Sequence, residues 1–236
     1  MARAEKRALI VGTSLLRSEK LQDARRLQIT TSYGTVDLLE FRGHILLQRH
    51  GLNDYCPPHR INHHAHLLAL QQAGIRKVFA LGSVGSLHLR HPPGSVVVPD
   101  DFYAPTITPT FHQDGQGHHL PHFDPDLRAE LLAVLNQPPR LAPVDGGVYW
   151  QTTGPRFETP AEIRFHARHV DFVGMTMASE CILACELNLP YAAVGIVDNF
   201  ANGIGAEILT MDRFNKQVTL NADLAWTVLA MLLESS

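Results

Sequence analysis

The stretch that decides the fold runs from Val148 to Gly205 and reads VYWQTTGPRFETPAEIRFHARHVDFVGMTMASECILACELNLPYAAVGIVDNFANGIG. It contains two apolar runs that each end in a polar tip, VGMT (173–176) and GIVDN (195–199), with a helical segment between them. Strands that alternate with helices are typical of an α/β fold. Because such folds bind small molecules beyond their strand ends, we expect a ligand site at these two tips.

Helix signals flank the two tips. Thr159, Pro160 and Glu162 form a typical helix start, with Thr as N-cap, Pro at the first position and Glu at the third, and the helix should reach about Arg168. Residues 209–236 predict one long amphipathic helix packed on the sheet. Its apolar face would hold Phe214, Val218, Ala225, Val228 and Leu232.

The remainder of the chain supplies further strands and helices. Residues 7–11, 77–87 and 96–99 read as buried strands, 35–41 and 44–51 as a hairpin, and 59–74 and 127–137 as helices. Residues 103–127 lack periodicity and are too long for an ordinary connection, so we interpret them as a functional loop. We therefore predict a single domain over 1–236, with a mixed central β-sheet flanked by helices.

Composition excludes several classes of function. The chain has 236 residues, 45% of them hydrophobic and 18% charged, with a net charge of −3, which provides no basic surface for nucleic acid or an anionic membrane. The apolar run near the N-terminus breaks at Gly12, so it predicts neither a signal peptide nor a membrane span. We expect a cytoplasmic protein.

Metal binding is not expected either. Cys56, Cys181 and Cys185 lack the spacing of a zinc site and predict reduced thiols. Four histidines, His59, His63, His64 and His66, fall on several faces of one predicted helix, without interleaved Cys or carboxylates. The glycine pattern of a dinucleotide fold is also missing after the first strand, which argues against a nicotinamide or flavin enzyme.

The polar residues at the strand ends share one chemistry. They are the hydroxyls of Thr13, Ser83 and Thr176, the pair Arg49-His50, and then Glu158, Asp198 and Asn199. Arginine offers a rigid fork of donors that suits phosphate, and an asparagine amide both donates to and accepts from a heterocycle edge. This set predicts an oxyanion bound beside a neutral polar ligand.

Several separated motifs carry a family resemblance. They resemble motifs of the purine nucleoside phosphorylase and methylthioadenosine phosphorylase family, in its homotrimeric branch. These motifs are GPRFETPAEI, VGMTMASE and VDNFANG, together with RHG before PPHRINHHAHLLAL and VGSL before PGSVVVPDDF. The motifs occur in the same order and span nearly the whole chain. The resemblance implies phosphorolysis, in which inorganic phosphate attacks C1′ of a purine nucleoside and releases the base and a sugar 1-phosphate, with no cofactor.

The resemblance also implies roles for individual residues. Thr13, Arg49, His50 and Thr176 match the phosphate site, and Ser83 is a substitute for a hydroxyl that the family has near Gly82. Met175 would lie against the ribose. Asn199 and His50 would be the two catalytic residues, and Asn199 would stabilise the leaving purine at N7. Phe157 and Asp198 would also contact substrate. Glu158 would accept N1–H of a 6-oxopurine, whereas adenine has no N1–H to give.

The 5′ end of the sugar decides between related substrates. TMDRFNK (210–216) resembles the part of methylthioadenosine phosphorylases that provides an apolar wall, which Met211 and Phe214 would form here. HHLPHFDP resembles a loop that comes from the neighbouring subunit, with His119 in the matching position. An oxopurine reader with an apolar 5′ pocket suits a methylthioinosine phosphorylase of purine salvage. The alternatives are cleavage of methylthioadenosine, cleavage of ordinary inosine or guanosine, phosphate-independent hydrolysis, and a non-catalytic nucleoside sensor.

Overall fold

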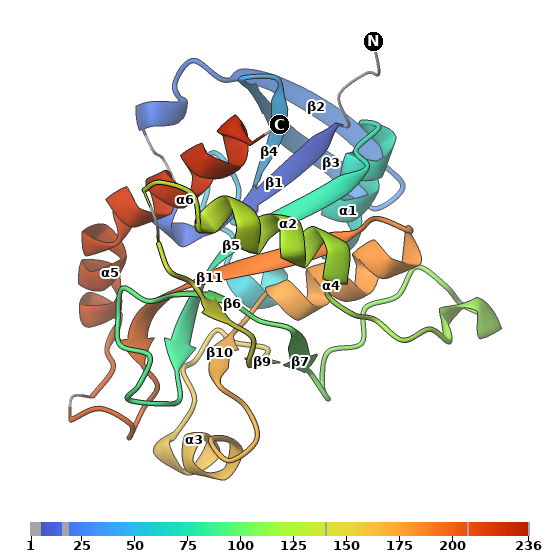
Figure 1. The fold of residues 1–236 in the computed structure, drawn as a ribbon. Helices are drawn as coiled ribbons and strands as arrows, with labels where there is room; N and C mark the ends of the chain where they lie inside the picture. The colour runs from blue at the N-terminus through green and yellow to red at the C-terminus, as the bar shows by residue number, and fades with distance from the viewer. Residues whose placement is uncertain (1–5, 16–18, 140, 207, 236) are drawn as a thin grey trace.

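A computed structural model describes residues 6–15, 19–139, 141–206 and 208–235, and it confirms the predicted single α/β domain with a mixed central sheet (Figure 1). The main path of the sheet runs β2-β3-β4-β1-β5-β10-β9-β7, and β11, β6 and β8 branch from β5. The strands are β1 (Arg7–Val11), β2 (Arg25–Thr31), β3 (Gly34–Phe41), β4 (His44–Gln48), β5 (Lys77–Ser86), β6 (Val96–Val98), β7 (Asp101–Tyr103), β8 (Val144–Asp145), β9 (Val148–Gln151), β10 (Phe172–Gly174) and β11 (Tyr191–Phe200).

The branch at β5 creates the space for a site. Strand β11 runs parallel to β5 along one edge, from Val78 to Ser86. The other edge is shared, because β1 pairs in parallel with Lys77 to Leu81 and β10 pairs antiparallel with Gly85 and Ser86. The ends of β1 and β10 therefore meet beside the middle of β5, and side chains from three strands converge there.

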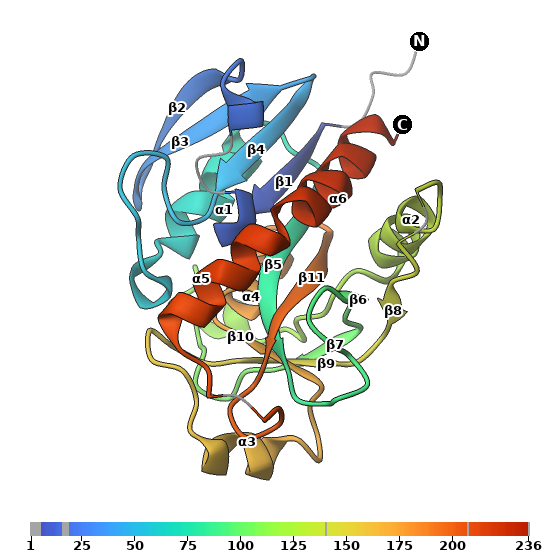
Figure 2. The same cartoon turned by 90° about the vertical axis from the view of Figure 1, so that its left-hand side faces the viewer.

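Helices cover both faces of the sheet (Figure 2). They are α1 (His63–Gln72), α2 (Pro125–Leu135), α3 (Pro160–His166), α4 (Met177–Glu186), α5 (Met211–Leu220) and α6 (Ala222–Glu234). Strand β1 shows how the faces divide, since Ala8 and Ile10 pack with α1 and α4, whereas Leu9 and Val11 pack with α2 and α6. All four side chains are buried, which fits a strand in the middle of a two-sided core.

Local sequence signals are confirmed at two places. The hairpin forms between β3 and β4, with Arg42 and Gly43 in the left-handed region at φ 50° and 82°. Helix α3 begins with the predicted capping box, in which the Thr159 hydroxyl accepts from the Glu162 N–H and the Glu162 carboxylate accepts from the Thr159 N–H. Strand β2 was not predicted, because its exposed RRLQITT pattern gives little apolar alternation.

Other predictions need correction. The C-terminal segment is two helices and not one, because Asn221 lies between α5 and α6 and its amide donates to the Val197 carbonyl at 3.2 Å and the Asp198 carboxylate at 2.7 Å. The predicted helix over 59–74 starts later, at His63, where the Asn62 side chain caps it.

Within the described residues, no helix has the length and apolar character needed to span a membrane.

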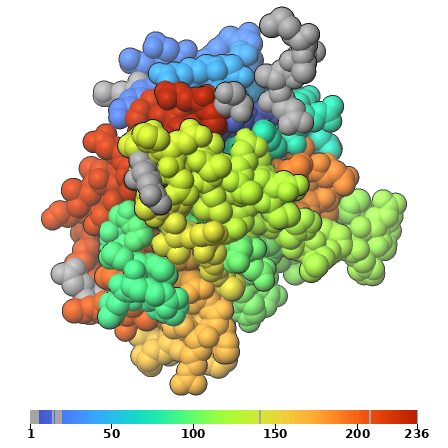
Figure 3. Space-filling model, viewed as in Figure 1, coloured from blue at the N-terminus to red at the C-terminus, as the bar shows by residue number. Residues whose placement is uncertain are grey.

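The segment between β7 and α2 has little regular structure beyond one short 3₁₀ turn, Gly115–Gly117. It projects from the body of the molecule on the right-hand side of Figure 3, where its green residues form a knob. Leu120 in this segment is 85% exposed.

Candidate active site

A cavity of about 260 Å³ lies where β1, β5 and β10 converge. It collects residues that are far apart in the chain and that the sequence singled out for different roles. Those that line it are Thr13, Arg49, His50, Ser83, Phe157, Glu158, Met175, Thr176, Asn199, Met211 and Phe214. Two of the proposed site residues, Asp198 and His119, do not line it.

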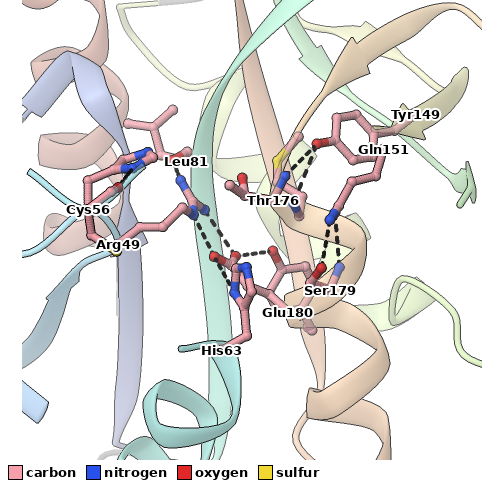
Figure 4. Close-up of polar contacts among 12 residues, drawn as sticks. Arg49, Cys56, His63, Leu81, Tyr149, Gln151, Thr176, Ser179 and Glu180 are labelled. Atoms are coloured by element: carbon pink, nitrogen blue, oxygen red, sulfur yellow. Dashed lines mark hydrogen bonds and ion pairs between the residues drawn. The ribbon is translucent and has the colours of Figure 1, made fainter. Parts of the chain in front are cut away.

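At one end of the cavity, Arg49 is held by three fixed contacts (Figure 4). Its Nε and Nη2 donate to the two carboxylate oxygens of Glu180 at 2.5 and 3.0 Å, and Nη1 donates to the Leu81 carbonyl at 3.1 Å. Gly12 permits this position, because a Cβ there would lie 2.7 Å from Nη1. Three of the five guanidinium N–H groups are used in these contacts, which leaves two for a ligand.

Glu180 is the buried partner that keeps this end charged. It is fully buried in α4, and one carboxylate oxygen also accepts from the Tyr191 hydroxyl at 2.7 Å. Burial alone would raise the pKa of the Glu180 carboxyl, but the charge and hydrogen bonds of Arg49 hold the pKa below its usual value. The pair is therefore ionised, and the guanidinium has a fixed orientation before any anion binds.

His50 lies beside Arg49 in its neutral form. Burial lowers the pKa of His50 to about 4. Its Nδ1 is 2.8 Å from the Cys56 carbonyl, which can only accept, so Nδ1 carries the proton and Nε2 carries a lone pair. The ring stacks on Tyr55 with centroids 5.2 Å apart. His50 therefore presents an acceptor, and not a second positive charge, to the cavity.

Thr176 lies opposite, at the start of α4. It is the N-cap residue, yet its hydroxyl makes no capping hydrogen bond and is thus available to a ligand. The N–H groups of Thr176 and Met177 donate to the Tyr149 hydroxyl at 3.2 and 3.4 Å, and Ser179 N–H donates to Gln151. Side chains of β9 therefore satisfy three N–H groups at the start of this helix.

At the other end, Glu158 and Asn199 form a polar edge. Glu158 is 7% exposed, its Oε1 accepts from the Thr152 hydroxyl at 2.6 Å, and its backbone carbonyl accepts from Asn202. Burial raises the pKa of Glu158. Asn199 lies just after a bulge in β11 and donates to the Phe200 carbonyl at 2.9 Å. The two side chains offer an acceptor and an amide to a flat polar ligand.

Asp198 does not line the cavity, so its contact with substrate stays a prediction from the sequence. β11 has a bulge between Val197 and Asn199, and Asn199, not Asp198, lines the cavity. The Asp198 carboxylate instead accepts hydrogen bonds from Ser83 and Asn221. Ser83 lines the cavity, but its single hydroxyl proton is donated to Asp198.

Apolar side chains form another wall of the cavity. Leu209, Met211 and Phe214 line it, and Phe214 packs against Phe157 with ring centroids 5.9 Å apart. Met211 is the first residue of α5 and remains 54% exposed. His119 lies elsewhere, in the projecting segment, with Nδ1 at 3.9 Å from Glu186. The same chain therefore does not bring His119 to this wall.

The clustered histidines of α1 have different surroundings. His63 is buried at 3.9 Å from Glu180, whereas His64 stacks on Tyr33 and lies 3.0 Å from the Thr110 carbonyl. Among the described residues, no group of three or more His, Cys, Asp or Glu is arranged to hold a metal ion.

Sequence reasoning missed the residues that support the site from behind. Glu180, Tyr149 and Gln151 do not line the cavity, but they position Arg49 and the start of α4. One signal was present, because Glu180 is a single carboxylate on the apolar part of ASECILAC, and a buried carboxylate requires a cation. Nothing in the sequence says which cation that is.

Comparison with known proteins identifies the relatives of this chain. The sequence model of the family described as "Phosphorylase superfamily" matches residues 6–234 of this chain. The chain is 39% identical over 83% of its length to a "Probable 6-oxopurine nucleoside phosphorylase" of Archaeoglobus fulgidus, 82% of which is covered. It is 35% identical over 89% of its length to a "Probable S-methyl-5'-thioinosine phosphorylase" of Methanocaldococcus jannaschii, 84% of which is covered.

A solved structure shares the fold. The methylthioadenosine phosphorylase from Schistosoma mansoni superimposes with a TM-score of 0.84 at 24% identity, and the match covers 97% of this chain and 91% of that one. The likeness extends over the sheet and its flanking helices. It supports the single-domain architecture described above.

Proposed function

The chain belongs to the phosphorylase superfamily, and we propose that it is a purine nucleoside phosphorylase that cleaves the N-glycosidic bond of 6-oxopurine nucleosides with inorganic phosphate. The products are the free base and ribose 1-phosphate or its 5-methylthio derivative. One observation carries the proposal: a single cavity holds the fixed cation Arg49 at one end and the pair Glu158 and Asn199 at the other. An oxyanion and a purine fit those two ends, with the sugar between them.

The phosphate end supplies both binding and reaction. Arg49, Thr13 and Thr176 donate hydrogen bonds to phosphate oxygens, and the Nε2 lone pair of His50 accepts a hydrogen bond from the hydroxyl of hydrogen phosphate. One phosphate oxygen then attacks C1′ while the bond from C1′ to the purine nitrogen breaks. Because the ribosyl centre becomes cation-like, the phosphate beside it also stabilises the transition state electrostatically.

The base end determines which purine leaves. The bond electrons move into the purine, and the Asn199 amide donates to N7, where negative charge develops. Ionised Glu158 only accepts hydrogen bonds, so it pairs with N1–H of hypoxanthine or guanine. The names of the relatives from Archaeoglobus fulgidus and Methanocaldococcus jannaschii, which both denote 6-oxopurine chemistry, support this preference.

The sugar 5′ position contacts the apolar wall. Met211 and Phe214 offer carbon and sulfur surface and no hydrogen-bond partner for a 5′-hydroxyl. A methylthio group at this position would bury its methyl and sulfur there. We therefore propose methylthioinosine as a substrate, with methylthioadenosine cleavage as the alternative.

We further propose a homotrimer in which the segment around His119 reaches the site of a neighbouring subunit. The projection of that segment and the absence of His119 from the lining of its own cavity support this arrangement. The reaction needs phosphate as co-substrate and no cofactor. Purine salvage in the cytoplasm stays the prediction made from the sequence.

The test is base release from four nucleosides, inosine, methylthioinosine, adenosine and methylthioadenosine, each with and without phosphate. We expect release that depends on phosphate and that is fastest for methylthioinosine. Release without phosphate would identify a hydrolase, and nucleoside binding without any release would identify a sensor. Faster cleavage of the adenine nucleosides would contradict the roles of Glu158 and Asn199.

A further inference from the structure

Glu158 separates two cavities. Besides the cavity of the proposed active site, it lines a second one of about 400 Å³, together with Thr152, Thr153, Trp150 and His166 among others. The Thr152 hydroxyl donates to Oε1 of Glu158 at 2.6 Å. Thr152 follows β9 directly and its backbone N–H donates to the Gly174 carbonyl at 2.9 Å, so the hydroxyl is anchored by the sheet.

The protonation of Glu158 decides which purine it can pair with. An ionised carboxylate accepts from N1–H of hypoxanthine or guanine, but it faces a lone pair on N1 of adenine. A neutral carboxylic acid can donate its proton to N1 of adenine while its other oxygen accepts from the 6-amino group. A buried carboxyl at this position therefore reads the two base classes in opposite charge states.

We propose, on the basis of the phosphorylase function above, that Thr152 is a specificity-determining positioning residue, whose hydroxyl keeps Glu158 an ionised acceptor for N1–H of 6-oxopurines. A hydrogen bond to an ionised acceptor is stronger than one to a neutral acid. Because Oε1 is engaged with Thr152 on the side of the second cavity, Oε2 is the oxygen left for the base. Thr152 itself does not touch the substrate, and acts only through Glu158.

The electrostatics around Glu158 give this contact its weight. Burial raises the pKa of Glu158, and the Thr152 hydrogen bond is the strongest of the effects that oppose the rise. Nearby charges add less, because Arg156 is exposed and already paired with Glu162 at 2.8 and 2.9 Å. The other titratable groups that line the two cavities are Tyr103 and His166 on one side, and Tyr55, Arg49 and His50 on the other.

The experiment compares Thr152→Val with two controls. Thr152→Ser keeps the hydroxyl, and Thr153→Val changes a neighbouring threonine that lines the second cavity but is exposed. For each protein, kcat/KM is measured for inosine and adenosine from about pH 5.5 to about pH 8.5, a range in which a buried carboxyl can titrate. Equilibrium binding of hypoxanthine and adenine in the presence of phosphate is measured over the same range.

In Thr152→Val we expect the ratio of inosine to adenosine kcat/KM to fall about tenfold or more, the factor that follows from losing a hydrogen bond to a charged group. As the pH falls, kcat/KM for adenosine should rise relative to kcat/KM for inosine. In Thr152→Val this change should begin at a higher pH, because the acid form of Glu158 then persists to higher pH. Thr152→Ser and Thr153→Val should keep the wild-type ratio and pH profile.

The inference is overturned if Thr152→Val keeps the wild-type ratio and profile, or if Thr152→Ser loses them to the same extent. Base binding separates this failure from failure of the proposed function. A wild-type protein that prefers hypoxanthine to adenine but releases no base would refute phosphorolysis alone, and the effect of Thr152→Val on that binding preference would still decide the role of Thr152.

Discussion

Two regions of the cavity, the phosphate end and the apolar wall proposed for the sugar 5′ group, are built on different principles. At the phosphate end, Arg49 is 1% exposed and is held by Glu180 and the Leu81 carbonyl, with Tyr191 behind Glu180. At the 5′ end, Met211 is 54% exposed and begins α5. Among the residues of α5 that the structure describes, Val218 is the single buried one. The first end is fixed by buried charges, and the second is an open apolar surface.

The difference follows from what each end must recognise. A phosphate dianion gains from a cation only if that cation is already oriented and desolvated, since reorganisation at the time of reaction costs free energy. A methylthio group needs contact area and no directional partner. The comparison predicts that substitutions have large effects on folding and turnover at the phosphate end, and small effects confined to substrate preference at the 5′ end.

The largest effect is expected for Glu180→Ala. Removing one partner of a buried ion pair leaves the Arg49 charge uncompensated in the core, and we expect the free energy of unfolding to drop by about 3–5 kcal/mol. Urea titration followed by circular dichroism measures this quantity. A drop below about 1 kcal/mol would mean that the pair does not fix this end, and the comparison would fail.

The matched control is Glu40→Ala. Glu40 forms a pair with Arg25 at 2.5 Å, but the two side chains are 40% and 70% exposed. An exposed pair of this kind contributes under about 1 kcal/mol. The contrast between the two variants isolates burial as the cause, because the chemical groups are the same.

The same contrast explains what the sequence predicts and what it does not. Arg49, His50, Thr176, Glu158 and Asn199 stand at strand ends or turns within motifs, and the structure gathers them into one cavity. Their partners are set by packing between distant elements. The bond between Arg49 and Glu180 joins residues 131 positions apart, and no local pattern specifies it.

Adjacent residues on a strand present a related difficulty. The motif VDN predicts polar side chains at the end of β11, but it does not say that Asn199 lines the cavity while the Asp198 carboxylate accepts from Asn221. Likewise, the C-terminal periodicity identifies the buried face of Val218, Ala225 and Val228 correctly. It does not reveal that Asn221 divides the segment, because that division depends on hydrogen bonds to β11.

An intermediate effect is expected for Asn199→Ala, at the polar edge that holds the base. Loss of the amide that supports the leaving purine should lower kcat by about 10²-fold, with little change in stability because Asn199 is only half-buried. Single-turnover base release measures the chemical step. Asn215→Ala, an exposed asparagine on α5, is the control and should retain the wild-type rate. An unchanged rate in Asn199→Ala would remove this residue from the mechanism.

The smallest effect is expected for Met211→Ser at the apolar wall. Losing contact with one or two carbon or sulfur groups of the substrate weakens binding by about 1 kcal/mol, so the preference for methylthioinosine over inosine should fall about fivefold. Leu220→Ser, which is 66% exposed at the far end of α5 and does not line the cavity, provides the control. The ratio of the two kcat/KM values is the measurement, because any general loss of activity cancels in it. Because Met211 is an exposed residue at the first position of a helix, we expect Met211→Ser to leave the free energy of unfolding nearly unchanged. A loss of stability as large as that of Glu180→Ala would mean that the 5′ end is as rigid as the phosphate end, and the comparison would fail.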